Sequence, residues 1–212
     1  GHLAHAYLFV GLPRVGKTTL AVALAQALNC RAAKVPCGEC LSCQKIARWM
    51  HPDVRLVEAE PDTNAIKIEQ IRELQREAVL SPFEGAWRVY VIPEFQKATA
   101  EAANCLLKTL EEPPPRVVLI LTAPDTGALL PTIVSRCQVY KLRPLPSQQT
   151  SSALQRLCGA SPEKADLLAR LSEGRIGWAI NACADEQILR TRAERLDMLR
   201  GLPHQSLAAR FQ

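Results

Sequence analysis

The residues with the clearest chemistry lie in a glycine-rich segment near the start of the sequence. The segment fits the pattern G-x-x-x-x-G-K-[ST] and consists of Gly11, Leu12, Pro13, Arg14, Val15, Gly16, Lys17, Thr18 and Thr19. In this pattern the glycines let backbone N–H groups wrap a polyphosphate, the lysine reaches the outer phosphates and the hydroxyl holds Mg²⁺. We therefore interpret the segment as a loop that binds ATP with Mg²⁺. The alternative is a glycine turn that matches the pattern by chance.

The residues on either side of this loop favour the first interpretation. The apolar run 6–10 predicts a buried strand, and the alanine-rich run 18–28 predicts a helix. A strand, a glycine turn and a helix N-terminus in this order direct free N–H groups and the helix dipole at an anion.

The second chemical feature is a group of cysteines. Of eight cysteines in the chain, four are close together in sequence: Cys30, Cys37, Cys40 and Cys43. Two overlapping C-x-x-C steps let thiolates converge on one ion, and four thiolates favour structural Zn²⁺. A reduced, metal-free loop is the alternative. We expect the four scattered cysteines to be small buried residues; they are Cys105, Cys137, Cys158 and Cys183.

An acidic residue follows the strand-like run 87–92, where a phosphate-loop protein holds Mg²⁺ and activates water. The sequence there is Pro93-Glu94, so it has one carboxylate and a proline where a metal-holding aspartate is expected. Thr122 directly follows another apolar strand, 117–121. We expect both segments to reach the same edge of a sheet, because nucleotides bind at the carboxyl ends of parallel strands.

The elements that position these residues alternate between strand and helix. Predicted strands are 6–10, 54–57, 87–92, 117–121 and 138–142; predicted helices are 18–28, 44–50, 67–80, 98–110 and 129–137. Continuous apolar strands alternating with helices predict an α/β fold with a parallel sheet covered on both faces. After the prolines of 143–146 we predict only helices: 147–158, 161–172, 176–184 and a charged helix from 187 to 199.

The composition narrows the class of protein further. The chain has 212 residues and a net charge of +5, with no basic block interleaved with aromatic residues. It contains no apolar run of roughly 18–20 residues that could cross a membrane. We therefore expect a cytoplasmic protein without a membrane partner. The mild positive charge permits binding to nucleic acid or another acidic partner but does not require it.

Taken together, the motifs resemble those of the bacterial DNA polymerase III clamp-loader subunits, which are AAA+ ATPases. The resemblance rests on 5–9, the phosphate loop, the four cysteines, the run Ala102–Pro114 and Ser135-Arg136-Cys137. It implies a Rossmann-like P-loop AAA+ domain over 1–143, with the cysteine module 30–43 inserted, and a three-helix lid over 144–185. The remainder, 186–212, would begin a truncated helical region, and an adenine-contacting segment would be missing at the start.

Two kinds of subunit in this family compete: the ATP-hydrolysing gamma/tau type and the delta-prime type. Three departures favour the delta-prime type. The Walker B motif reads Pro93-Glu94, the run Ala102-Ala103-Asn104 lacks an aromatic residue before the asparagine, and Gly177 replaces the sensor-2 arginine. Arg175 is near that position but out of register.

The resemblance also implies roles and partners. Arg136 would be an arginine finger that acts on the ATP of a neighbouring subunit, Glu94 a degenerate Walker B residue and Thr122 the sensor-1 residue. For Arg136 alone, a surface ion pair is the alternative. The implied partners are the gamma/tau and delta subunits and, through the complex, the sliding clamp and primed DNA. Lys97 and Lys108 could approach DNA phosphates, although solvated charges are more common.

Two other functions compete with a non-hydrolysing clamp-loader subunit. One is an autonomous nucleotide hydrolase that uses Glu94 as the base, with Thr18 and water holding Mg²⁺. The other is a zinc-dependent nucleic-acid reader built on the cysteine module, which is disfavoured because few basic or aromatic residues surround it.

Overall fold

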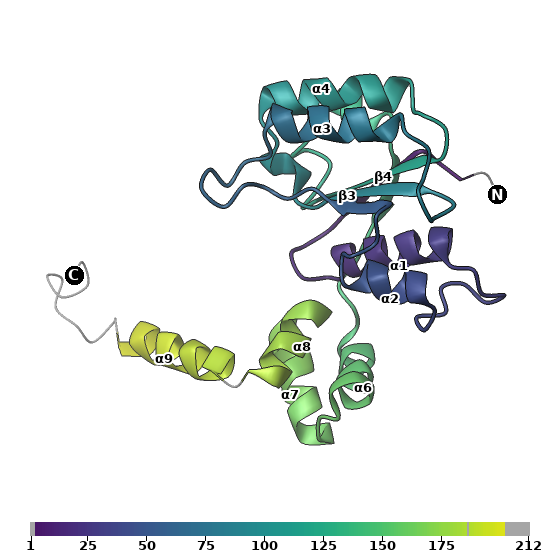
Figure 1. Cartoon of the computed structure of the whole chain (residues 1–212). Helices are drawn as coiled ribbons and strands as arrows, with labels where there is room; N and C mark the ends of the chain where they lie inside the picture. Colours follow the sequence, from purple (N-terminus) through teal and green to yellow (C-terminus); the bar gives the residue numbers. More distant parts are fainter. Residues whose placement is uncertain (1–2, 186, 202–212) are drawn as a thin grey trace, which may run out of the picture. The chain divides into compact units, whose positions relative to one another are not determined.

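The computed structural model of the chain describes residues 3–185 and 187–201. It divides into two compact units, Gly1–Arg143 and Pro144–Gln212. The first unit carries the phosphate loop and the cysteine module, and the second is helical (Figure 1). None of the described helices is long and apolar enough to span a membrane.

The first unit is built on a parallel sheet of five strands in the order β2-β3-β4-β1-β5. The strands are β1 (Ala6–Val10), β2 (Val54–Leu56), β3 (Arg88–Ile92), β4 (Val117–Ala123) and β5 (Gln138–Lys141). Every residue of β1 and β4 is buried, as expected for central strands covered on both faces. The α/β fold predicted from the alternating elements is confirmed.

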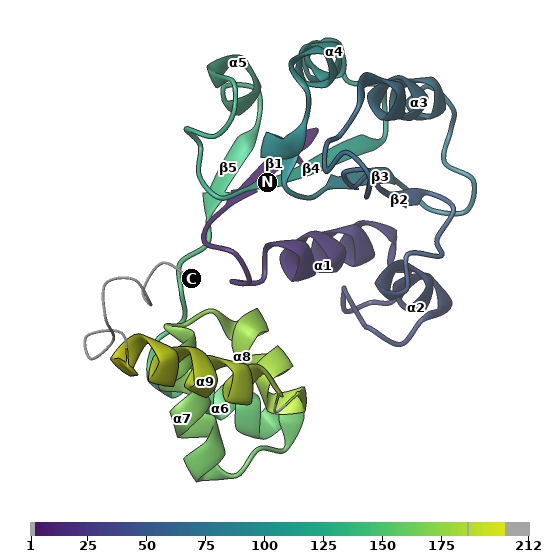
Figure 2. The same ribbon diagram turned by 90° about the vertical axis from the view of Figure 1, so that its left-hand side faces the viewer.

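Helices cover both faces of this sheet. Helices α1 (Lys17–Asn29) and α2 (Leu41–Ala47) lie on one face, and α3 (Ile68–Ala78), α4 (Ala100–Glu111) and α5 (Pro131–Val134) lie on the other (Figure 2). A short 3₁₀ helix, η1 (Phe95–Lys97), follows β3. Buried side chains on the two faces form separate cores, one around Leu8 and Leu106 and the other around Phe9 and Ala25.

Two predicted helices are wrong in their extent. The helix expected over 44–50 begins earlier, at Leu41, because the Cys40 side chain accepts a hydrogen bond from the N–H of Cys43 and caps the helix there. The helix expected over 129–137 is only Pro131–Val134. It cannot start earlier because Leu130 precedes a proline, which disfavours the helical conformation, and Leu130 is extended.

The register of the sheet brings three strand ends together. Ile92 pairs with Leu121, Phe9 with Thr122 and Val10 with Ala123. The segments that follow β1 and β3 therefore leave the sheet at the same edge, beside the end of β4. This edge is where a parallel α/β sheet offers a ligand site.

The second unit contains α6 (Ser147–Cys158), α7 (Pro162–Ser172), α8 (Ile176–Ala184) and α9 (Gln187–Gly201). Its small core consists of Leu154, Ala165, Leu168, Ala179 and Ala182. Gly174 has φ 77°, and a Cβ there would overlap the carbonyl oxygen of Leu145, so the turn before α8 requires glycine.

The scattered cysteines are less buried than predicted. Cys158 is exposed, and Cys105, Cys137 and Cys183 are half-buried. Cys158 is the last residue of α6, where a helix end meets solvent. The expectation of four buried thiols is therefore wrong.

Candidate functional site

Two glycines of the phosphate loop have backbone conformations that other residues adopt only with strain. The N–H of Gly11 lies 3.2 Å from the carbonyl oxygen of Ala123 and 3.1 Å from that of Pro124, which anchors the loop to the end of β4. Gly11 has φ 154°, and a Cβ there would lie 2.5 Å from the carbonyl oxygen of Leu142. Gly16 has φ 102° and begins α1, and no side chain among the described residues caps this helix. The N–H groups at the start of α1 are therefore available to an anion.

Lys17 is the first residue of α1 and lies back over the loop. Its ammonium donates to the carbonyl oxygens of Gly11, at 2.6 Å, and Leu12, at 3.0 Å. Burial lowers the pKa of Lys17, and the negative charge of Glu94 acts against that shift. The lysine and Glu94 are therefore close enough to influence each other across this edge of the sheet.

Glu94 and Thr122 are in direct contact at that edge. The N–H of Glu94 donates to the hydroxyl of Thr122 at 3.1 Å, and Thr122 is fully buried within β4. Glu94 has φ 49°, which turns the chain sharply after β3. Its carboxylate, however, forms an ion pair with Lys97 at 2.7 Å and is 59% exposed. The structure thus brings the phosphate loop, Glu94 and Thr122 together, with Glu94 as the one carboxylate of the Pro93-Glu94 segment and its ion pair to Lys97 exposed to solvent.

Arg136 follows α5 two residues after its end, and α5 lies on the face of the sheet opposite α1 (Figure 2). Its guanidinium forms an ion pair with Glu111 at 2.8 Å and donates to the carbonyl oxygen of Thr132 at 2.9 Å. Within this chain, Arg136 therefore has the surface ion pair that was the alternative to a finger role. A role toward a neighbouring subunit stays a prediction.

The four clustered cysteines converge on one point. All four Sγ atoms lie within 4.8 Å of one another, with Cys30 and Cys37 3.5 Å apart and Cys37 and Cys43 3.9 Å apart. A tetrahedral zinc with Zn–S bonds of about 2.3 Å requires sulfur separations of about 3.8 Å. The donor set and its spacing therefore fit structural Zn²⁺.

Backbone hydrogen bonds and burial shift the pKa values of these thiols in opposite directions. The N–H of Cys43 donates to the Cys40 sulfur at 3.5 Å and lowers the pKa of Cys40 to about 6. Burial raises the pKa of Cys43 to about 12. The N–H of Cys40 also donates to Cys37 at 3.3 Å. N–H donors to sulfur stabilise thiolates, which are the form that binds metal.

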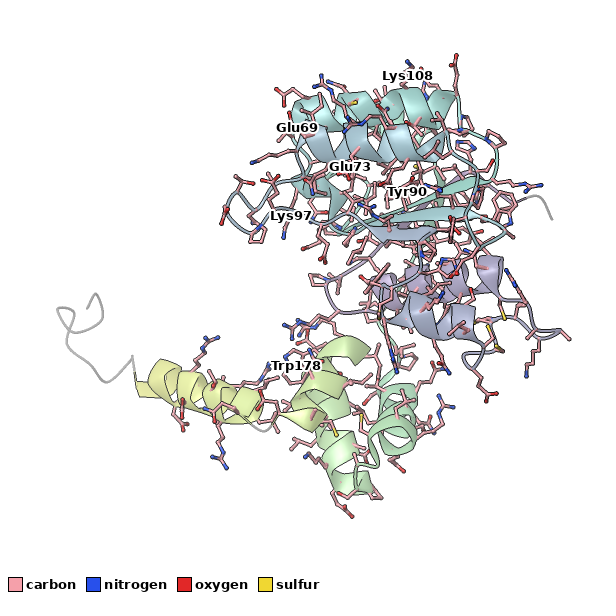
Figure 3. All side chains as sticks on the ribbon, viewed as in Figure 1. Glu69, Glu73, Tyr90, Lys97, Lys108 and Trp178 are labelled. Atoms are coloured by element: carbon pink, nitrogen blue, oxygen red, sulfur yellow. The ribbon has the colours of Figure 1, made fainter. Side chains whose placement is uncertain are left out.

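The two lysines considered for DNA contact do not gather into one patch. Lys97 is the last residue of η1 and is paired with Glu94, whereas Lys108 is exposed on α4 (Figure 3). In the second unit, Arg175 precedes α8, and its side chain donates to the carbonyl oxygen of Ser172 at 3.0 Å. Gly177 lies in the first turn of that helix.

Sequence reasoning missed a buried carboxylate that connects the cysteine module to the sheet. Asp53 is fully buried and accepts hydrogen bonds from the backbone N–H groups of Phe83, Glu84 and Gly85 at 2.6–2.8 Å. The Glu84 side chain in turn binds Lys45 of α2 at 2.8 Å. The only available signal was an acidic residue directly before a strand, which is too common to single out.

Solved structures of other proteins share this fold. The RuvB Holliday junction branch migration motor of Thermotoga maritima matches with a TM-score of 0.59 and 18% identity, over 91% of this chain and 57% of that one. A DNA polymerase III gamma subunit-related protein of the same organism matches with a TM-score of 0.51 and 20% identity, over 80% and 53%. The chain therefore shares its fold with these two proteins.

The family follows from sequence comparison. The model of the family described as "DNA polymerase III, delta subunit" matches residues 1–146, and the chain belongs to this family. DNA polymerase III subunit tau of Escherichia coli K12 is 36% identical over 188 residues, 85% of this chain. DNA polymerase III subunit delta' of Bacillus subtilis 168 is 35% identical over 193 residues, 91% of this chain.

These relatives are longer proteins of both kinds. The chain spans 29% of the length of the tau subunit and 57% of the length of the delta' subunit. The resemblance to DNA polymerase III clamp-loader subunits is confirmed. Because tau and delta' match at nearly the same identity, the choice between the two kinds of subunit depends on the site.

Proposed function

We propose that this chain is a delta-prime-type subunit of the DNA polymerase III clamp loader. It assists ATP-driven loading of the sliding clamp on primed DNA, and it supplies Arg136 to the ATP of a neighbouring gamma/tau subunit. The observation that supports this proposal is the residue pair Pro93-Glu94, which follows β3 at the edge of the sheet beside the phosphate loop. Pro93 takes the place of a metal-holding aspartate, and the carboxylate of Glu94 is engaged by Lys97 at 2.7 Å.

This edge is poorly suited to hydrolysis in the chain's own site. In phosphoryl transfer the protein contributes positioning and charge stabilisation, and Mg²⁺ neutralises charge that develops on the phosphate oxygens. Losing a metal-holding carboxylate raises the barrier by several kcal/mol, which lowers the rate about 10²-fold or more. An intact phosphate loop beside such an edge supports nucleotide binding with weak or absent turnover.

Arg136 is suited to act on a neighbour. A planar guanidinium can bind phosphate oxygens through two donors, and it remains charged at any physiological pH. It follows α5 and pairs with Glu111 of α4, two helices on the face of the sheet opposite α1, so it is not part of the chain's own phosphate loop. Its partner Glu111 is 51% exposed, and an exposed ion pair is readily exchanged. The partners in this proposal are the gamma/tau and delta subunits, with no membrane involved.

The cysteine module has a structural role in this proposal. Four thiolates around Zn²⁺ leave no open coordination position for a substrate, so the ion would hold the segment between α1 and α2. The cofactors proposed are therefore structural zinc and, at the phosphate loop, ATP.

A second candidate is an ATP-hydrolysing subunit of the gamma/tau type. The complete phosphate loop and the 36% identity to a tau subunit favour it. It requires Glu94 to leave Lys97 and act as the base. The two candidates differ in where turnover occurs, in the chain itself or only in its neighbour.

The test is the ATPase rate of a complex reconstituted with gamma/tau and delta subunits. Arg136→Ala should lower this rate about 10-fold or more, since arginine fingers contribute large factors to phosphoryl transfer. Arg72→Ala, an exposed arginine on α3, serves as the control and should leave the rate unchanged. An unchanged rate for Arg136→Ala in an intact complex would remove the finger role.

A further inference from the structure

The phosphate loop contains a second cation besides Lys17. Arg14 has φ 65°, the left-handed conformation that side chains disfavour and glycine accepts freely. Its side chain is exposed, and no carboxylate among the described residues forms an ion pair with it. A charged arginine therefore occupies the tip of the loop, three positions before the lysine that reaches the phosphates.

The same site offers few ligands for Mg²⁺. This ion takes an octahedral shell of oxygens, in which several waters and substrate phosphates are joined by one or two carboxylates of the protein. Pro93 has no carboxylate, and that of Glu94 is bound to Lys97 at 2.7 Å. The hydroxyl of Thr18, at the start of α1, is the remaining protein oxygen that the motif supplies. The protein therefore offers Mg²⁺ one hydroxyl and one carboxylate that is already paired, and the remaining ligands would have to be phosphate oxygens and water.

We infer that the phosphate loop binds ATP without requiring Mg²⁺, and that Arg14 supplies the positive charge that the metal provides elsewhere. This inference rests on the proposed function, in which the loop binds nucleotide without efficient turnover. A guanidinium keeps its charge at physiological pH and presents several N–H donors that match phosphate oxygens. Arg14 and Lys17 together place two cations on one short loop, next to the N–H groups at the start of α1.

The chain contains a matched control for Arg14. Arg116 is also an exposed arginine in the left-handed conformation, with φ 59°. It precedes β4, at the opposite end of that strand from Thr122 and the phosphate loop. Replacing either arginine by glycine removes one positive charge and relieves the same backbone conformation. Only Arg14→Gly changes the charge at the loop.

The experiment is isothermal titration of the full chain with ATP, once with excess Mg²⁺ and once with EDTA. For the wild type, the dissociation constants under the two conditions should agree within about fivefold. Arg14→Gly should weaken ATP binding about 10-fold in EDTA and less in Mg²⁺, because Mg²⁺ already neutralises part of the nucleotide charge. Arg14→Lys should retain part of the affinity, and Arg116→Gly should bind like the wild type.

Three results would overturn the inference. One is wild-type binding that weakens more than about fivefold in EDTA. Another is Arg14→Gly that binds ATP in EDTA as tightly as the wild type or more tightly, which would mean that Arg14 is neutral or obstructs the loop. The third is the absence of ATP binding under both conditions. None of them affects the role of Arg136, which is measured on the ATP of the neighbouring subunit.

Discussion

The guanidinium of Arg136 lies 2.8 Å from the carboxylate of Glu111, so the segment after α5 is joined to the end of α4. The side chains are 35% and 51% exposed. Exposed ion pairs contribute only about 0–1 kcal/mol, so exchanging Glu111 for a phosphate of a neighbouring subunit costs little. The ion pair holds Arg136 at the surface and is compatible with a role in trans.

The first prediction concerns Glu111. Glu111→Gln keeps the shape of the side chain but removes its charge, so Arg136 is released while it remains present. The ATPase rate of the reconstituted complex should stay within about threefold of the wild type or rise, because the ion pair between Arg136 and Glu111 contributes little free energy. A loss as large as that of Arg136→Ala would show that Glu111 positions the arginine, and that the ion pair is not merely a resting contact.

The second prediction concerns the cysteine module. The purified chain should contain about one zinc ion, measured by elemental analysis, since four sulfurs already lie at the spacing of a tetrahedral site. Cys40→Ser should lose the metal and lower the stability by about 3 kcal/mol or more, because metal binding is coupled to folding.

Cys158→Ser is the control for this substitution, because Cys158 is an exposed thiol outside the cluster. It should leave both the zinc content and the melting temperature unchanged. A wild-type chain without metal, whose melting temperature does not respond to a chelator, would contradict the zinc assignment.

The third prediction concerns pH and Asp53. Burial acts to raise the pKa of this carboxyl, but the N–H donors of Phe83, Gly85 and Glu84 outweigh burial and lower the pKa below its ordinary value of 3.8. Its stabilising contribution is therefore present above that value, and it is lost as the pH falls below it toward the folded-state pKa.

Asp53→Asn should cost about 1.5–3 kcal/mol at pH 7, because one carboxylate with three charge-assisted hydrogen bonds is replaced by an amide. The gap between variant and wild type should narrow near pH 3, and denaturant unfolding at both pH values measures it. Asp62→Asn, in an exposed loop, is the control. An equal gap at both pH values would contradict the assigned role of the charge.

The sequence was sufficient for most of the secondary structure. The boundaries of β1, α6 and α8 match the predicted ranges, because a proline or glycine lies at or near an end of each. Errors occurred at α2 and α5, where a cysteine cap and the residue before a proline set the boundaries. These are local contacts that hydrophobic periodicity does not contain.

The candidate site was partly predictable for a similar reason. Motif spacing places Gly11, Lys17 and the four cysteines, because each motif is a short stretch of chain. It could not show that Glu94 is bound to Lys97, that Arg136 is paired with Glu111, or that Asp53 anchors the 83–85 turn. Two of these three contacts join residues that are 25 or more positions apart, and all depend on side-chain conformations fixed by the fold.

The most direct test of the central claim is the steady-state ATPase rate of the purified chain alone, with ATP and Mg²⁺. The account predicts turnover at least about 10²-fold below the 1 s⁻¹ that is ordinary for an enzyme, because the Mg²⁺-holding carboxylate is missing. Turnover of about 1 s⁻¹ that Lys17→Ala abolishes would contradict it and identify the chain as a hydrolysing subunit.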